Sequence, residues 1–207
     1  MLEPKRVDRV VDLASVALIS VAAVLTALCG YQSGRWAGQQ ARLYNLAEAG
    51  RIRSAEAADR ANVLMAIDVG LFLHYVDAVA AGNAREATFI LGRFRPEVKP
   101  AVQAWLATKP LRNPHAPSSP FAMPQYALKT QAEAHADDAA ASANFNAAVE
   151  ATRHSDDFLL LTVIFAGVSF LGGISTKLVY PRHAIAVAVA LVGLIYGLIR
   201  LVQLPFS

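Results

Sequence analysis

The chain has 207 residues, of which 55% are hydrophobic and 17% are charged, and its mean hydropathy is +0.37. This composition is too apolar for an ordinary soluble domain. Residues 35–157 carry 13 acids and 13 bases, and such a neutral segment argues against a nucleic-acid-binding surface, which needs a net basic face. The net charge of +3 comes from Lys177, Arg182 and Arg200, because no acid follows Asp157.

Three segments are long and apolar enough to cross a bilayer. Residues 13–34 and 158–176 contain no charged residue, and residues 184–204 contain only Arg200. A helix rises about 1.5 Å per residue, so about 20 residues cross the hydrocarbon layer. A cleaved signal peptide is the alternative for the first segment, but its apolar core is too long and lacks a clear cleavage site. We therefore expect three transmembrane helices in a lipid bilayer.

The bases in the short connections predict the orientation of these spans. Lys5, Arg6 and Arg9 lie in the tail 1–12, and two further bases lie in the loop 177–183 between the second and third spans. Short loops rich in Lys and Arg stay in the cytoplasm. Residues 35–157 and the C-terminal tail 205–207 are then expected to face outward, into the periplasm or the exterior.

The outward segment reads as helical throughout. Residues 33–81 contain no proline and predict one long helix or two collinear ones, ended by Gly82-Asn83. Two short helices are expected at 84–94 and 97–108, then a proline-rich loop at 109–124, then an alanine-rich helix at 125–157 that can continue into the second span. The predicted fold is all-α, with three transmembrane helices and an extramembrane stalk of two long and two short helices.

One apolar stripe is predicted on the second half of the first long helix. Its members follow helical spacing, and they are Leu64, Ile67, Leu71, His74 and Ala78. This stripe is expected to face the core, with His74 buried in it.

Small residues recur at helical spacing in two places. Gly30, Gly34 and Gly38 lie where the first helix leaves the bilayer, and the third span carries a second series, Ala186, Ala190, Gly193 and Gly197. Apolar spans gain little from leaving lipid, so their association relies on the close backbone approach that small residues permit. The pattern fits packing among the three spans of one chain, or packing between copies in a homo-oligomer.

Arg200 is the one charge inside a predicted span. Near the outer end of the third span its guanidinium can extend to the headgroups. An intramembrane charge that faces neighbouring helices would instead mark an anion contact, a pore lining or a pair between subunits.

Three histidines have an aspartate three residues later, on the same helix face. With one nearby glutamate the set comprises His74, Asp77, His135, Asp138, Glu150, His154 and Asp157. Imidazole and carboxylate groups are ligands for zinc and similar ions, whereas a solvated helix surface is the ordinary outcome for such residues. No cofactor is implied otherwise, and no nucleophile elbow, phosphate-binding glycine loop or zinc-protease motif occurs, so we expect no enzyme activity.

Pro114, Pro117 and Pro120 recur every third residue and can form a short polyproline II segment. It can act as a stiff connection between helices. It can also act as a docking surface for a partner protein, with Phe121 and Met123 as anchors.

Three runs of sequence carry a family resemblance. They are RFRPEVKPAVQAWLATKPLRNP at 93–114, APSSPFAMPQY at 116–126 and GYQSGRWAGQQARLY at 30–44. They resemble an uncharacterised family of bacterial three-span inner-membrane proteins that have a helical insert between the first two spans. The resemblance implies a bacterial origin and an inner (cytoplasmic) membrane location, and the bases of the short connections predict that the N-terminus lies in the cytoplasm. It assigns no activity and no functional residue.

Two function classes remain open. The first is a non-catalytic assembly or accessory subunit that uses its stalk for protein–protein contacts, as a homo-oligomer or within a larger membrane complex. The second is an oligomeric ion channel or transport component with a pore between protomers, near Arg200 and the small-residue series.

Overall fold

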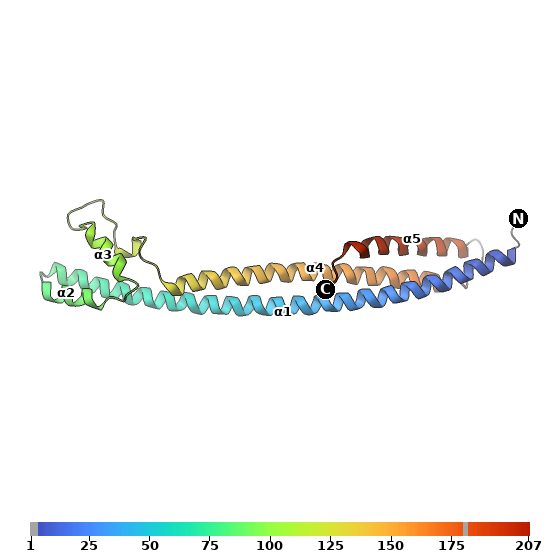
Figure 1. Cartoon of the computed structure of the whole chain (residues 1–207), viewed down its shortest axis with the longest axis horizontal. Helices are drawn as coiled ribbons and strands as arrows, with labels where there is room; N and C mark the ends of the chain where they lie inside the picture. Colours follow the sequence, from blue (N-terminus) through green and yellow to red (C-terminus); the bar gives the residue numbers. More distant parts are fainter. Residues whose placement is uncertain (1–3, 180–181) are drawn as a thin grey trace. The chain divides into compact units, whose positions relative to one another are not determined.

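The computed structural model describes residues 4–179 and 182–207, with side chains from residue 13 onward. Within these ranges all regular elements are helical: α1 (Pro4–Ala80), α2 (Ala84–Arg93), α3 (Lys99–Ala107), the 3-10 turn η1 (Pro120–Ala122), α4 (Lys129–Ser175) and α5 (Arg182–Gln203) (Figure 1). The predicted all-α class is confirmed. The side chains of Lys5, Arg6 and Arg9 and residues 180–181 of the predicted loop lie outside the described residues.

The helices α1, α4 and α5 are each long and apolar enough to cross a membrane, as the three predicted spans require. The first long stalk helix is a single element with the first span, because α1 continues unbroken from Pro4 to Ala80. The last stalk helix likewise continues into the second span within α4. It begins at Lys129 rather than near Gln125, because the chain first makes a turn in which the Tyr126 amide donates to the carbonyl of Met123.

The chain divides into two compact units, each of which contains part of α1 and part of α4. The terminal unit comprises Met1–Asn45 and Asn144–Ser207, and the central unit comprises Leu46–Ala143. The terminal unit thus holds the three predicted spans, and the central unit holds most of the predicted stalk. Each unit has its own buried core.

In the terminal unit α1 and α4 run antiparallel, and their register is marked by serine pairs. The hydroxyls of Ser15 and Ser175 lie 3.2 Å apart in a buried contact. Ser33 and Ser155 donate to each other's backbone carbonyls at 3.0 and 3.1 Å. Between these pairs the core contains Leu18, Ala22, Cys29, Phe158, Leu161, Phe165, Val168, Ala190 and Leu201.

The last helix, α5, lies along the second half of α4 (Figure 1). Ala190 is fully buried, and two glycines of α5 lie very close to α4. A Cβ added at Gly193 would lie 3.0 Å from Val168 Cγ2, and one added at Gly197 would lie 2.5 Å from Phe165 Cε1. After α5 the chain end contacts α1, where Trp36 Nε1 donates to the carbonyl of Pro205 at 3.2 Å.

In the central unit α1 and α4 pack through very short side chains. Ser54 Oγ donates to the carbonyl of Ala134 at 2.9 Å, and a Cβ added at Gly50 would lie 2.9 Å from Ala141 Cβ. The buried alanines of this contact are Ala47, Ala57, Ala61, Ala134 and Ala141. Because such side chains occupy little space, the two backbones approach closely, and the alanine-rich part of α4 is a packing surface rather than a wholly solvated helix.

A second core of the central unit joins the end of α1 to α2, α3 and the proline-rich loop. Its buried members are Phe72, Tyr75, Ala78, Ala87, Ile90, Phe94, Val98, Val102 and Trp105. The Phe72 ring makes edge contacts with Trp105 at 5.1 Å and with Phe121 at 5.6 Å between ring centroids. Aromatic side chains therefore supply much of the buried surface here.

The predicted apolar stripe on α1 is displaced by about one residue from the face that is buried. Ile67 is 56% exposed and His74 is exposed, so the expectation of a buried His74 is wrong. The buried positions are instead Asp68, Phe72 and Tyr75, whereas Ala78 of the predicted stripe is buried as expected. The physical reason is that this part of α1 carries apolar residues on more than one side. Which side is buried depends on where the other helices pack against it.

Candidate functional site

A buried ionic cluster in the central unit is centred on Asp68. The Asp68 side chain is 1% exposed and accepts two hydrogen bonds from Arg95, from Nε to Oδ1 at 3.0 Å and from Nη2 to Oδ2 at 2.5 Å. This is the two-pronged geometry in which a guanidinium binds a carboxylate most strongly. A carboxylate this deeply buried needs such a partner, because an unpaired buried charge is very costly.

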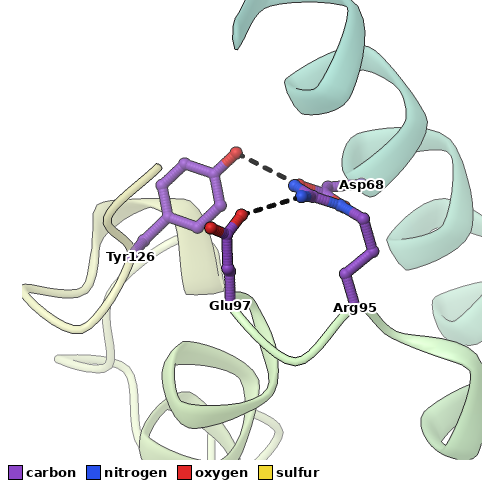
Figure 2. A network of polar contacts seen from close by, with 4 residues as sticks. All are labelled: Asp68, Arg95, Glu97 and Tyr126. Carbon is purple, nitrogen blue, oxygen red and sulfur yellow. Dashed lines mark hydrogen bonds and ion pairs between the residues drawn. The ribbon is translucent and has the colours of Figure 1, made fainter. Parts of the chain in front are cut away.

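The local sequence explains why Arg95 reaches Asp68. Helix α2 begins at the Asn83 cap, whose side chain accepts from the Glu86 amide and donates to the Glu86 carboxylate. The helix must end before Pro96, because a proline disfavours helical geometry in the residue before it. Arg95 therefore lies in the short connection before α3, facing α1 (Figure 2).

Two further side chains complete the cluster, from the start of the α3 region and from the loop before α4 (Figure 2). Glu97 Oε2 accepts from Arg95 Nη1 at 2.9 Å, and the Tyr126 hydroxyl donates to Asp68 Oδ2 at 3.4 Å. The hydrogen bond with Asp68 raises the pKa of Arg95 above its ordinary value. Three segments that are distant in sequence are thus joined at one carboxylate, and the arrangement suits a structural clamp because each charged member has a partner.

Tyr126 provides a spectroscopic test of this cluster. Burial and the negative charge of Asp68 raise the pKa of Tyr126 to about 12. An ultraviolet titration of the full-length protein should show a tyrosine that ionises well above the ordinary phenol pKa of about 10, and Tyr126→Phe should abolish that step. Because the folded pKa exceeds the unfolded one, the free energy of unfolding should fall as the pH rises from about 10 to about 12. A high-pH step that persists in Tyr126→Phe would refute this assignment.

Sequence reasoning missed the cluster, although one signal was present. Asp68 stands among the apolar residues Leu64, Leu71 and Phe72, and a carboxylate in such a position must find a partner. The identity of that partner was not readable, because Arg95 and Tyr126 are 27 and 58 residues away.

Arg200 has a partner within its own chain. Its Nη2 lies 3.8 Å from Asp157 Oδ1, and the two side chains are 43% and 38% exposed. The pair joins the end of α5 to the residue just before the second predicted span on α4. An anion or pore contact at Arg200 stays a prediction, and the structure gives the charge a local neutralising partner.

The small residues divide into two groups. Ala190, Gly193 and Gly197 pack against the chain's own residues, whereas Ala186 on α5 is half-buried. At Gly30, Gly34 and Gly38 an added Cβ would meet no atom of the described residues within 4 Å. The first group therefore serves packing within one chain, and the glycines of α1 are not required for it.

The histidines and carboxylates of the metal hypothesis are not brought together. Within the described ranges no three His, Cys, Asp or Glu side chains are grouped so that they could hold a metal ion. His154 contacts Trp36 with ring centroids 4.7 Å apart and the two rings tilted by 49°, and Glu150 forms an ion pair with Arg153 at 2.6 Å. Asp157 is the partner of Arg200. The remaining four candidates, His74, Asp77, His135 and Asp138, likewise belong to no such group.

The predicted docking segment is folded back on the central unit. Phe121 and Met123 are partly buried against the aromatic core, and Pro120 is buried in η1, so a docking role for this segment stays a prediction. Hydrogen-bonded turns replace the expected polyproline II segment, with the Ala116 amide donating to the carbonyl of Asn113. The loop lies against the aromatic core because this contact removes part of these apolar surfaces from water. Pro114 and Pro117 remain at least partly exposed.

Comparisons with known proteins gave no match: neither family models, nor curated proteins, nor solved structures resemble this chain significantly.

Proposed function

We propose that this chain is a non-catalytic bacterial inner-membrane protein that serves as an assembly or accessory subunit. The observation that carries the proposal is an exposed apolar ridge in the central unit. Val63 and Ile67 are 60% and 56% exposed and lie one turn apart on α1. They belong to the segment that the sequence places outside the bilayer, where neighbouring exposed apolar side chains favour protein–protein contact.

The arrangement in the membrane follows from the same sequence signals. The bases Lys177 and Arg182 favour a cytoplasmic connection between α4 and α5, with the N-terminal tail on the same side. The central unit then faces the periplasm or the exterior, where its ridge is available to other proteins. The resemblance of three sequence runs to bacterial three-span proteins supports this placement.

Self-association through α1 is part of the proposal. The glycines 30, 34 and 38 leave room for a second helix backbone, and the packing of the chain itself does not use that room. The channel alternative depends on Arg200, which has Asp157 as a partner in the same chain. The assembly role is therefore the one that we propose.

A photocrosslinking experiment tests the contact surface. A photoreactive amino acid placed at Ile67 of the full-length protein in native membranes should give discrete adducts, and Val63→Lys should abolish them. The matched control carries the photoreactive group at Gln103, which is exposed on α3 and outside the ridge. An adduct twice the chain mass would identify a second copy, and another defined mass would identify a partner. Equal, diffuse labelling from Ile67 and Gln103 would refute the proposal.

The glycine face is tested by particle mass in nanodiscs. Gly34→Leu should shift the protein toward monomers, because a leucine fills the space that close helix packing needs. Gly173→Leu is the control, since Gly173 on α4 is equally open in the structure. A wild-type protein that is strictly monomeric would contradict self-association.

A further inference from the structure

An apolar groove in the central unit lies between the end of α1 and the proline-rich loop. Its cavity volume is about 950 Å³. The α1 wall runs from Phe72 to Ala80, which is about 12 Å along the helix axis. Trp105 and Leu106 of α3 line it further, and residues 109–114 and 116–118 supply the opposite wall. The volume lies within the range of about 300–1,000 Å³ that is typical of small-molecule sites.

The loop wall is held in place by a set of hydrogen bonds. Trp105, which lines the groove, donates from Nε1 to the carbonyl of Pro117 at 2.7 Å. Asn113 Nδ2 donates to the carbonyl of Thr108 at 3.2 Å, and the Arg112 amide donates to the carbonyl of Lys109 at 2.8 Å. The groove is therefore preformed, which reduces the entropic cost of binding a ligand.

The charges on this groove have one sign. Its lining includes Lys109 and Arg112 and no acidic residue. Both cations are exposed, and within the described part of the chain neither forms an ion pair. Lys109 has a φ of +54°, a left-handed conformation that is unfavourable for a residue other than glycine. Such local strain is often found at binding sites, and here it occurs at one of the two cations.

We propose that this groove binds a free fatty acid or a closely similar long-chain carboxylate. The apolar tail lies along Phe72, Val76 and Val79 of α1, and the carboxylate is neutralised by Lys109 and Arg112. An apolar wall with cations confined to one side is complementary to an amphipathic anion and gives no advantage to a neutral or cationic ligand. This site is separate from the ridge at Val63 and Ile67, so it goes beyond the proposed assembly role.

The chain contains its own reporter for this site. It has two tryptophans, so Trp36→Phe leaves Trp105, which lines the groove, as the only one. The full-length Trp36→Phe protein in nanodiscs is titrated with cis-parinarate, a fluorescent long-chain fatty acid that accepts energy from tryptophan. We expect saturable energy transfer from Trp105 that palmitate displaces and that hexadecanol, its uncharged counterpart, displaces at least about fivefold less well.

Two groove variants in the same background test the tail and head contacts separately. Val76→Glu places a carboxylate on the apolar wall and should weaken cis-parinarate binding by about tenfold or more. Lys109→Gln with Arg112→Gln should weaken it by about five- to tenfold while leaving the dissociation constant of hexadecanol, corrected for the weaker binding of the probe, unchanged. The matched control is Ile52→Glu, an exposed apolar position on the same helix outside both the groove and the ridge, which should bind like the parent.

The other outcomes overturn the proposal. Energy transfer that does not saturate, or that is equal in all variants, would place the probe in the bilayer alone. Equal displacement by palmitate and hexadecanol would refute recognition of the carboxylate. Trp105 emission without probe shows whether each variant has kept the fold, and Leu73→Glu, at a second exposed position of the same wall, replaces Val76→Glu if that variant unfolds.

Discussion

Replacing Arg95 with alanine is expected to lower the free energy of unfolding of the central unit by about 3 kcal/mol. The substitution leaves the Asp68 carboxylate, which is 1% exposed, without its two strongest hydrogen bonds. The value is at the lower end of the range for breaking buried pairs because Arg95 itself is 26% exposed. Denaturant unfolding of the full-length protein in nanodiscs, followed by Trp105 fluorescence in a Trp36→Phe background, measures the change.

Two control variants separate the clamp from ordinary surface charge. Arg95→Lys keeps the positive charge but loses the planar fork, so its loss of stability should be intermediate. Arg53→Ala removes the exposed pair with Asp137, at 3.4 Å, and should cost less than about 1 kcal/mol. If Arg95→Ala were no more destabilising than Arg53→Ala, the cluster would not act as a clamp.

Introducing valine at Gly197 is expected to destabilise the packing of α5 on α4 by about 2 kcal/mol. A Cβ at this position would lie 2.5 Å from Cε1 and 2.7 Å from Cζ of Phe165, whose side chain is fully buried and cannot swing into solvent. The cost of overpacking exceeds the gain in helix propensity from removing a glycine, which is below about 1 kcal/mol. Thermal unfolding of the terminal unit in nanodiscs, followed by Trp36 fluorescence in a Trp105→Phe background, should show the loss.

Gly167→Val is the matched control for this prediction. Gly167 lies on α4 in the same unit, and an added Cβ there meets nothing within 4 Å. It should unfold near the wild-type temperature. Equal destabilisation by both substitutions would show that α5 does not make the close contact with α4 described above.

The helices of this protein were readable from its sequence because their signals are local. Long charge-free runs, the absence of proline from 33–81 and the Gly82-Asn83 stop all act within a few residues. The continuation of the last stalk helix into the second span was open in the sequence, and α4 shows it as one element. Helix bounds in the stalk moved by only a few residues, as is usual at frayed or capped ends.

The contacts were much less predictable because they depend on residues distant in sequence. The apolar residues around Asp68 occupy more than one side of α1, so spacing alone could not choose between Ile67 and Phe72 as the core position. The sequence suggests Phe121 and Met123 as exposed anchors, and only the position of the aromatic core shows that both side chains are partly buried against it. Arg200 and Asp157 could be paired only once α5 was seen to lie along α4.

The run of buried alanines between α1 and α4 has a consequence for how this sequence can change. Apolar character is abundant in the chain, so one leucine or valine that faces outward can replace another at little cost. A side chain larger than methyl at Ala57 or Ala141 would instead force two long backbones apart along their length. Amino-acid substitution in this protein is therefore limited more by the side-chain volume allowed at its buried alanines than by the hydrophobicity required at its large apolar residues.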